Sequence, residues 1–410
     1  MLRNGGNAID AAVTAALAAE AELDAFEPVP MIGPRTFTVP GALDLVERAL
    51  DLHGTIAWQD AVEPARQLAR DGFEVRATLE AAVVRMEHHL AADPVLRALY
   101  LPGDRPVRAG ERVRNARLAD ALETVARFGA RELYDGALGV AIAARSRDAG
   151  GHLDRDDLLA HRTLPMQPVS TTFQGADVWE LPAPTQGPAV LDALAILEAA
   201  GRFEPKAIVD ALLAGLRGAG VDLLSMQPSA PARGDTTYIA AIDEAGVGVS
   251  LITSVFADFG SVVGVDALGG PLQNRAAGST LVGRRPSAGK PPHTTIPAVV
   301  TRDGALAHCL GVVGGYMQAQ GQVQVLVNLL VHGMSAQAAI DAPRLRILAG
   351  GALAIEPGHP LAASAPDGLG RDPGAGGFGG CQVASVVDGR LDAGSDPRRG
   401  GAVARADAQQ

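Results

Sequence analysis

The residues best placed for chemistry are two threonines at the head of an expected strand. Thr236 and Thr237 follow a turn-forming Gly234-Asp235 and precede an alternating segment that runs to Asp243. A hydroxyl there can attack the carbonyl carbon of the residue before it, and hydrolysis of the ester formed would free the α-amino group of Thr236. That amine, with an unperturbed pKa of about 7.7–8, can take the proton of the hydroxyl, so one residue would hold both nucleophile and base.

The same threonines also have an ordinary structural interpretation. β-Branched residues are common at strand starts, so the pair alone favours a plain strand. A second alternating segment, Val247 to Ile252, follows a short turn, and the two segments predict a β-hairpin. A catalytic role for Thr236 therefore depends on other stretches of the chain. One of them, Gln186-Gly187, opens an expected helix and offers backbone N–H groups to an anion or simply caps the helix.

Composition excludes several classes of protein. The chain has 410 residues, of which 47% are apolar and only 4% aromatic, so a core of alanine, valine and leucine is expected. A net charge of −11 argues against a nucleic-acid partner. Cys309 and Cys381 are the only cysteines and are expected to be small buried residues, since no Cys/His spacing suits zinc. No metal or organic cofactor is implied, and the cytoplasm is the expected location, because no signal peptide or membrane-length apolar run is evident.

Helical patterns dominate the first part of the chain and strands the second. A hairpin is expected around Gly175, and after Thr236 strands alternate with one long amphipathic helix. The expected helices span about 7–23, 41–50, 58–70, 78–90, 117–127, 137–147 and 188–200, with a short one from His152 and one after Gly315 whose apolar stripe runs from Val323 to Leu330. The expected strands span about 169–173, 178–181, 236–242, 247–252, 295–300, 305–313, 345–348, 353–355 and 383–387. The tail after Asp396 is polar and expected to be disordered. This order predicts an α+β protein in which helices cover a pair of sheets.

The motifs of several common enzyme classes are missing from the sequence. We find no glycine-rich dinucleotide fingerprint, no P-loop, no Gly-x-Ser-x-Gly elbow and no His-Glu-x-x-His. Dinucleotide enzymes, kinases, elbow-type serine hydrolases and zincins are therefore disfavoured.

Eight short stretches, taken in order, resemble the γ-glutamyltransferase (γ-glutamyltranspeptidase, glutathione hydrolase) family of proenzymes, which have the four-layer αββα N-terminal-nucleophile hydrolase fold. They cover most of the chain, and their ordered set is more specific than any single one. The stretches are Asn4 to Ala12, Thr38 to Ala42, Ala69 to Phe73, Pro184 to Gly187, Gly234 to Thr237, Val312 to Gly315, Asp341 to Arg344 and Gly394 to Arg398.

The resemblance implies a role for several residues. Cleavage between Asp235 and Thr236 would give a mostly helical large subunit, 1–235, with a late hairpin, and a small subunit, 236–410, folded together as one αββα domain. Thr236 would be the nucleophile of both autocleavage and acyl transfer, and Ser254 falls where the family has a second hydroxyl that supports it. Gly314-Gly315 would donate backbone N–H groups to the oxyanion. His293-Thr294 falls where the family has a Ser-Ser pair near the substrate carboxylate.

Departures from the family pattern affect the expected substrate. Gly278 stands where an aspartate would bind the substrate's α-amino group, and Phe256 stands where an asparagine would reach the same region. The stretch Leu272 to Arg275 is typical of a divergent branch that includes oxamate amidohydrolase-like proteins, and Arg275 is a candidate to hold an acid group or is a surface arginine. The chain also resembles an internally shortened member, because Glu22 to Pro40 is too short for a family strand segment and its carboxylate-binding arginine.

The sequence thus predicts a self-processing amidase that acts on γ-glutamyl or related small acidic amides through a Thr236 ester. One alternative is a hydrolase of another small amide, such as oxamate. A second alternative, of a different class, is an inactive, unprocessed relative that acts at most as a binding protein. Expected partners are a small-molecule amide and the two subunits of one precursor; neither nucleic acid nor membrane is expected, and a homodimer is left open.

Overall fold

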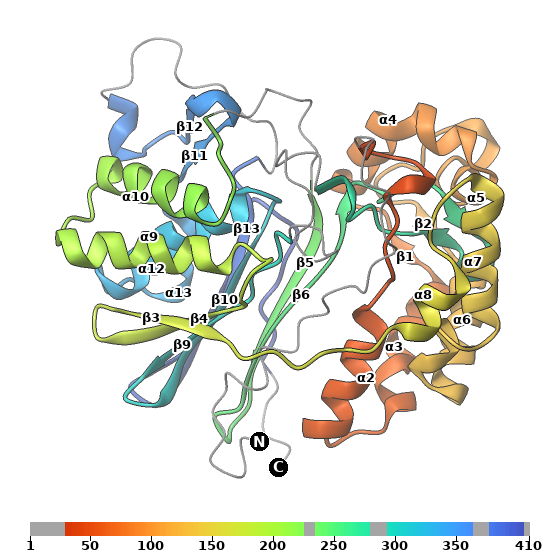
Figure 1. Cartoon of the computed structure of the whole chain (residues 1–410), viewed down its shortest axis with the longest axis horizontal. Coiled ribbons are helices and arrows are strands. Elements are labelled where there is room, and N and C mark those ends of the chain that lie inside the picture. Colours follow the sequence, from red (N-terminus) through yellow and green to blue (C-terminus); the bar gives the residue numbers. More distant parts are fainter. Residues whose placement is uncertain (1–28, 225–233, 279–292, 364–376, 406–410) are drawn as a thin grey trace. The chain divides into compact units, whose positions relative to one another are not determined.

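The computed structural model describes residues 29–224, 234–278, 293–363 and 377–405, and these form two compact units (Figure 1). The described part of the first unit spans 165–254 and 293–405, and that of the second spans 29–164 and 255–278, with the gaps just given. The bond between Asp235 and Thr236 lies within strand β5 (Gly234–Ile242) of the first unit. The helix expected over 7–23 lies outside the described residues.

An antiparallel six-stranded sheet forms the centre of the first unit. Its order is β14-β13-β10-β9-β4-β3, and neighbours along the chain pair as hairpins. The strands are β3 (Val169–Phe173), β4 (Ala176–Glu180), β9 (Ala298–Arg302), β10 (Ala305–Val313), β13 (Gly380–Val387) and β14 (Arg390–Ser395). Strand β10 is central and buried over its last six residues, as a strand covered on both faces must be.

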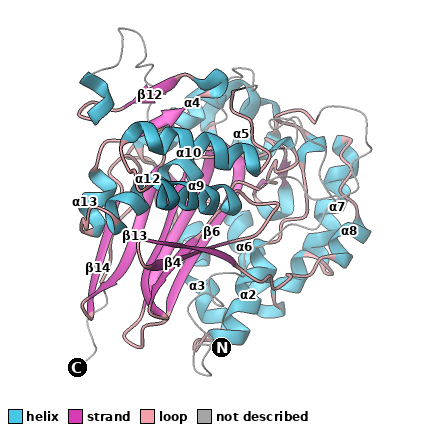
Figure 2. Ribbon diagram, turned by 60° about the vertical axis from the view of Figure 1, so that its left-hand side comes forward, coloured by secondary structure: helices cyan, strands magenta, loops and turns pink. Residues whose placement is uncertain are grey.

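One face of this sheet is covered by helices, which Figures 1 and 2 show as a layer beside the strands. They are α9 (Gly187–Ala200), α10 (Pro205–Gly218), α12 (Met317–Leu330) and α13 (Ala336–Asp341). Apolar residues expected on one face of α9 and α12 are indeed buried, including Val190, Leu194, Val323 and Leu326. A Cβ on Gly321 of α12 would lie 3.0 Å from Val312 Cγ1, so α12 packs closely on β10.

A two-stranded sheet of β5 and β6 (Gly248–Ala257) packs against the opposite face of β10. Successive side chains of a strand point to opposite faces, and Val312 faces α12. Its neighbours on the other face, Gly311 and Val313, contact Tyr238 of β5. The first unit therefore stacks a helical layer, a six-stranded sheet and a strand pair.

The second unit is mainly helical, with two small two-stranded sheets, β1-β2 and β7-β8. Its core has two clusters, one around Tyr134 and Ile142 and one around Leu90 and Leu96. Its elements are α2 (Ala42–His53), α3 (Trp58–Asp71), β1 (Phe73–Glu74), α4 (Ala77–Ala92), α5 (Pro94–Tyr100), β2 (Arg112–Val113), α6 (Ala116–Phe128), α7 (Ala137–Ala149), α8 (Arg155–Ala160), β7 (Gly264–Val265) and β8 (Gly270–Pro271). None of the described helices combines the length and apolar character needed to cross a membrane.

Most expected elements are confirmed, with boundaries shifted by a few residues. Strand β10 has the expected bounds, helix α12 contains the expected apolar stripe from Val323 to Leu330, and the predicted hairpin is β5 and β6. The strand expected from Thr295 begins at Ala298, because Pro297 lacks the N–H that pairing requires. Helix α5 and strand β14 were not expected, and neither was the short antiparallel pair of β1 and β2.

The expectation of a disordered tail after Asp396 is wrong for the first residues of that tail, because Arg398 is fixed by ion pairs. The Asp396 carboxylate is fully buried and lies 2.7 Å from the equally buried Arg344 guanidinium. It also accepts hydrogen bonds from the backbone N–H groups of Cys381 and Arg398, each at 2.9 Å. Arg398 extends the network to Glu356 at 2.6 Å. These contacts explain why the Asp341 to Arg344 and Gly394 to Arg398 stretches hold charged residues.

We expect Asp396→Asn to lower the free energy of unfolding by about 3–5 kcal/mol, because it leaves the buried Arg344 charge without its partner. Urea denaturation of wild type and variant measures the difference. Asp210→Asn is the matched control, since Asp210 pairs with Lys206 at 2.8 Å on an exposed helix face and should change stability by no more than about 0.5 kcal/mol. Equal small effects of the two substitutions would contradict the structural role of Asp396.

Candidate active site

Thr236 and Ser254 meet across the β5–β6 hairpin. Their hydroxyl oxygens lie 2.9 Å apart and form a hydrogen bond in which either oxygen can donate. Both side chains are half-buried and lie on the inward face of the hairpin, as do Tyr238 on β5 and Ser250 on β6. Thr237 and Ile239, at the alternate positions of β5, are exposed. The strand period thus turns Thr236, rather than Thr237, toward the sheet.

Tyr238 fixes the hairpin on β10. Its hydroxyl lies 2.8 Å from Ser250 Oγ, and Ser250 Oγ in turn donates to Leu310 O at 3.4 Å. A Cβ on Gly311 would lie 2.4 Å from the Tyr238 ring, so only glycine allows this approach. Burial raises the pKa of Tyr238 well above its usual range, so the hydroxyl stays protonated and remains a donor.

The packing of β5 on β10 shows the relative direction of the two strands and which of their ends lie together. Tyr238 contacts Val313, whereas Ile242, at the other end of β5, clusters with Cys309. The two strands therefore run in opposite directions, and Thr236 lies toward the end of β10 that leads into Gly314-Gly315. These glycines have φ angles of 130° and 61°, in the left-handed region that residues with a Cβ avoid.

The stretch Pro184 to Gly187 and the pair His293-Thr294 lie together in the first unit. The backbone N–H of Gln186 donates to His293 O at 3.1 Å, and His293 N–H donates to Pro184 O at 3.0 Å. The Gln318 amide, with its nitrogen toward two carbonyl oxygens, donates to Thr294 O at 2.7 Å and to Val312 O at 3.2 Å. Through Gln318, the His293-Thr294 segment is joined to the end of β10 that precedes Gly314.

The start of α9 is less open to an anion than the sequence allowed. Thr185 Oγ1 accepts the first helical N–H, that of Gly187, at 3.1 Å. A Cβ on Gly187 would lie 2.2 Å from Leu181 O, so the helix begins in close contact with the chain that leads into it. The glycine in this stretch is therefore required by packing, and the cap interpretation is the one that the contacts support.

A buried acid lies at the end of β4, close to the start of α9. Glu180 is fully buried, and its Oε1 accepts a hydrogen bond of 2.6 Å from Gln322 of α12. Burial raises the pKa of Glu180 well above its usual range, against the opposing effect of the Gln322 hydrogen bond. Among the described residues, Glu180 Oε2 and Gln322 Oε1 have no partner. A proton on Glu180 would let these two oxygens bond to each other and complete a reciprocal acid–amide pair.

Arg275 and Phe256 belong to the second unit, where they contact each other. The Arg275 guanidinium carbon lies 4.7 Å from the centre of the Phe256 ring, and both residues are buried. Arg275 is therefore not the surface arginine of the alternative interpretation. Phe256 has a φ of 76°, an uncommon backbone conformation for a bulky residue, and such strain tends to occur near functional sites.

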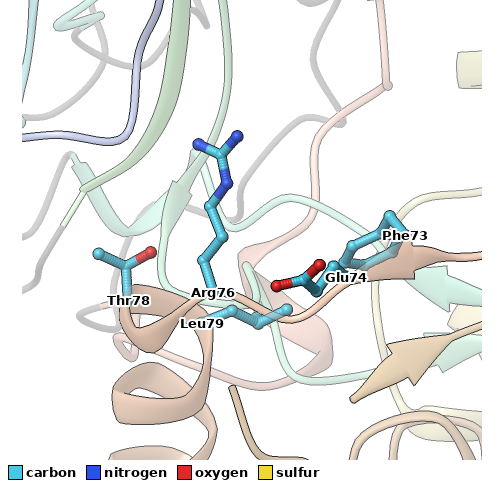
Figure 3. Close-up of a pocket in the computed structure, with 5 residues that line it drawn as sticks. All are labelled: Phe73, Glu74, Arg76, Thr78 and Leu79. Atoms are coloured by element: carbon cyan, nitrogen blue, oxygen red, sulfur yellow. The ribbon is translucent and has the colours of Figure 1, made fainter. Parts of the chain in front are cut away.

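A surface hollow of about 550 Å³ lies elsewhere on the second unit, lined by Phe73, Glu74, Arg76, Thr78 and Leu79 (Figure 3). Its polar side chains are exposed, and Figure 3 shows Arg76 and Glu74 extending in different directions rather than converging. None of the residues with candidate chemistry lines it. We therefore place the candidate active site in the first unit.

Sequence reasoning did not assign roles to Tyr238, Ser250, Gln318 or Glu180. Tyr238 and Ser250 lie in the two strands of the predicted hairpin, so their period-two spacing from Thr236 and Ser254 could have indicated a contact. Gln318 and Glu180 carried no comparable signal, because their partners are backbone carbonyls and a side chain far away in the sequence.

The chain is an α+β protein of the N-terminal-nucleophile hydrolase class, and its first unit shows a helical layer, a sheet and a strand pair, three of the four layers of the expected αββα sandwich. The crystal structure of cephalosporin acylase from Bacillus halodurans superimposes with a TM-score of 0.78 and 26% sequence identity, covering 100% of this chain and 93% of that one. The fold class expected from the sequence is thereby confirmed.

The chain belongs to the gamma-glutamyltranspeptidase family, whose model matches residues 18–213 and 218–406. A glutathione hydrolase-like proenzyme of Bacillus subtilis, YwrD, is 30% identical over 75% of this chain and 66% of its own length. The oxamate amidohydrolase proenzyme of Klebsiella pneumoniae is 28% identical over 73% of this chain and 67% of its own. The matched region thus spans about two thirds of the length of these relatives.

We expect Glu180→Gln to leave stability unchanged at pH 4 and to raise it progressively as the pH rises. Because the pKa of Glu180 is raised in the folded protein, the protonated acid contributes fully to the free energy of unfolding at pH values below its unfolded pKa of 4.5. This contribution is lost as the pH rises through the pKa of the folded protein. Glutamine carries no such penalty and can pair with Gln322 at every pH. Urea titrations from pH 4 to 9 measure the difference.

Glu180→Leu serves as the contrast, because it removes the acid and leaves the buried Gln322 amide without a partner, at a cost of about 1–3 kcal/mol at all pH values. A constant difference between wild type and Glu180→Gln across the range would mean that Glu180 keeps an ordinary pKa.

Proposed function

We propose that the chain is a self-processing N-terminal-threonine amidase that acts on γ-glutamyl or related small acidic amides. The observation that carries the proposal is the hydrogen bond of 2.9 Å between the Thr236 and Ser254 hydroxyls, at the sheet end where β10 leads into Gly314-Gly315. A nucleophile, a second hydroxyl and a glycine pair with left-handed φ angles are the groups that acyl transfer through an alcohol needs.

Autocleavage begins when Thr236 Oγ1 attacks the carbonyl carbon of Asp235. The peptide C–N bond breaks, and the nitrogen keeps its own proton and takes the one lost by the Thr236 hydroxyl, so it becomes the α-amino group of Thr236. An ester now joins the Asp235 carbonyl carbon to Thr236 Oγ1. Water then hydrolyses this ester, which releases the Asp235 carboxylate and the free Thr236 hydroxyl. The products are chains 1–235 and 236–410, both from one precursor.

In the mature protein the same oxygen attacks the amide carbon of the substrate. The α-amino group of Thr236 takes the hydroxyl proton and passes it to the leaving nitrogen, so an amine departs and an acyl ester remains on Thr236. Water attacks this ester in hydrolysis, and an acceptor amine attacks it in transfer. Either attack restores the hydroxyl.

Ser254 and Gly314-Gly315 are the proposed groups that stabilise the two negative charges formed in these steps, one on Thr236 Oγ1 and one on the oxygen of the attacked carbonyl. By donating to Thr236 Oγ1, the Ser254 hydroxyl stabilises the developing alkoxide and orients its lone pair. The backbone N–H groups of Gly314 and Gly315 are the proposed donors to the oxyanion, where loss of one donor typically costs about 10²–10³ in kcat. His293-Thr294 is the proposed contact of the acidic group of the substrate.

The substrate proposal rests on residues that differ from the glutathione-type pattern. Gly278 and Phe256 offer neither a carboxylate nor an amide to an α-ammonium group. Arg275 is the proposed partner of an acid group. The likeness to the oxamate amidohydrolase proenzyme, together with the Leu272 to Arg275 stretch, supports a second substrate candidate, a small amide such as oxamate.

We expect weak turnover of glutathione, because an unmade hydrogen bond to a charged group costs about 1.5–3 kcal/mol, or roughly ten- to a hundredfold in rate. The sharpest comparison uses γ-glutamyl anilide and its deamino analogue, glutaryl anilide, which differ only in the α-ammonium group. We expect kcat/KM on the glutaryl compound to equal or exceed that on the γ-glutamyl compound. A strong preference for γ-glutamyl anilide would refute the proposed lack of ammonium recognition.

Thr236→Ala should abolish both chain cleavage and amidase activity, because one hydroxyl serves both reactions. Thr236→Ser should retain part of each, since it keeps the hydroxyl and loses only a methyl group. A denaturing gel of purified protein, followed over days at neutral pH, measures cleavage, and amine release measures activity. Thr237→Ala is the matched control and should behave as wild type, because Thr237 is exposed on the other face of β5.

Two outcomes of that gel would overturn the proposal. A folded wild-type protein that stays intact and inactive would favour the unprocessed binding relative. If Thr236→Ala still gave two bands, split after Asp235, a separate protease would be making the cut and Thr236 would be an ordinary strand residue.

A further inference from the structure

Helix α12 carries four buried glutamines at alternate positions, an unusual feature for a helix inside a protein core. Gln318, Gln320, Gln322 and Gln324 are each no more than 7% exposed. A buried amide is costly unless it is hydrogen-bonded, so each must be paired for a reason. The period of the helix separates them into two pairs, since residues four apart share a face.

One pair holds strand β11 (Leu345–Ile347), which itself forms a hairpin with β12 (Leu353–Ile355). Gln324 donates to Leu345 O at 3.0 Å and accepts from Leu345 N–H at 2.9 Å. Gln320 donates to Ile347 O at 3.2 Å and accepts from Ile347 N–H at 2.7 Å. The two side chains therefore act as a strand edge for β11, and their task is structural.

The other pair faces the sheet, and Gln318 is its member at the Gly314-Gly315 turn. Its side-chain nitrogen donates to Val312 O, two residues before the turn, at 3.2 Å. Its backbone N–H donates to Gly315 O, within the turn, at 3.0 Å. The side-chain nitrogen of Gln318 also donates to Thr294 O, at 2.7 Å. One fully buried residue thus bonds the turn on both sides and joins it to the Thr294 segment.

Close packing limits the turn from another direction. A Cβ on Gly314 would lie 3.0 Å from the Gly379 Cα, and a Cβ on Gly379 would lie 2.7 Å from Val313 O. Gly379 has a φ of 74° and precedes β13. The turn is therefore confined by Gly379, while Gln318 bonds the chain on either side of it, at Val312 O and at Gly315 O.

We infer that Gln318 is a positioning residue for the oxyanion donors, because it sets the orientation of the Gly314-Gly315 peptide groups relative to the end of β10. The inference rests on the proposed function and deepens it. Two glycines in succession have many accessible backbone conformations, so donors carried by them need an external constraint to stay aligned. Donors that must reorganise during the reaction stabilise the oxyanion less than donors that are already aligned.

The test compares Gln318→Met with Gln324→Met, two substitutions that remove a buried amide of the same shape from the same helix. We expect kcat to fall by about 10- to 100-fold in Gln318→Met, with KM within about twofold of wild type, because loss of a whole donor costs about 10²–10³. For Gln324→Met we expect kcat within about threefold. The pH dependence of kcat/KM should be unchanged in both, because no titrating group is altered.

The rate of autocleavage gives a second readout, because it uses the same proposed oxyanion site and needs no mature enzyme. Soluble precursor of Gln318→Met should cleave 10- to 100-fold more slowly than precursor of Gln324→Met at equal folded fraction, measured by circular dichroism and gel filtration.

Equal losses of rate in Gln318→Met and Gln324→Met would overturn the inference and make Gln318 a structural residue like Gln324. So would a Gln318→Met variant whose KM rises while kcat is kept. In either case a wild-type enzyme that depends on Thr236 would leave the proposed function standing, whereas an inactive, uncleaved wild type would remove that function first.

Discussion

The first unit depends on a strand that is covered on both faces. Alternate side chains of β10 face α12 on one side and the β5–β6 pair on the other, and the absence of a side chain at Gly311 lets the Tyr238 ring approach. Because β5 is fixed on β10 in this way, the position of Thr236 follows from that of Tyr238, two residues on. The proposed nucleophile, the glycine turn and the start of α12 are thus arranged by the packing of one strand.

Much of the fold could be predicted from periodicity. The alternation in 236–242 and 305–313 and the apolar stripe from Val323 to Leu330 are strong signals, and each lies in an element of the expected type. Strand β14 was missed because Arg390, Asp392 and Ser395 give it a polar pattern typical of loops, although pairing with β13 makes it a strand. The ordered tail was missed because the partner of Asp396, Arg344, is distant in sequence, and only the fold brings the two charges together.

The candidate site was partly predictable for a related reason. A hydroxyl at a strand head and a Gly-Gly after a strand are local features, and a sequence displays them directly. Gln318 is different: its three bonds go to carbonyl oxygens, which every residue has, so no residue type elsewhere in the chain marks them as its partners. Glu180 is a similar case, because an acid becomes unusual only when burial removes its water.

The central sheet has a consequence for the two products of cleavage. Strands β3 and β4 precede the proposed bond at Asp235, while β9, β10, β13 and β14 follow it, so the ladder between β4 and β9 joins one product to the other. Helices α9 and α12 likewise pack together from opposite sides of that bond. Separation of the two products would require the hydrogen bonds between the buried strands β4 and β9 to break. The pair should therefore resist dilution, because its interface is the interior of a fold completed while the chain was still one molecule.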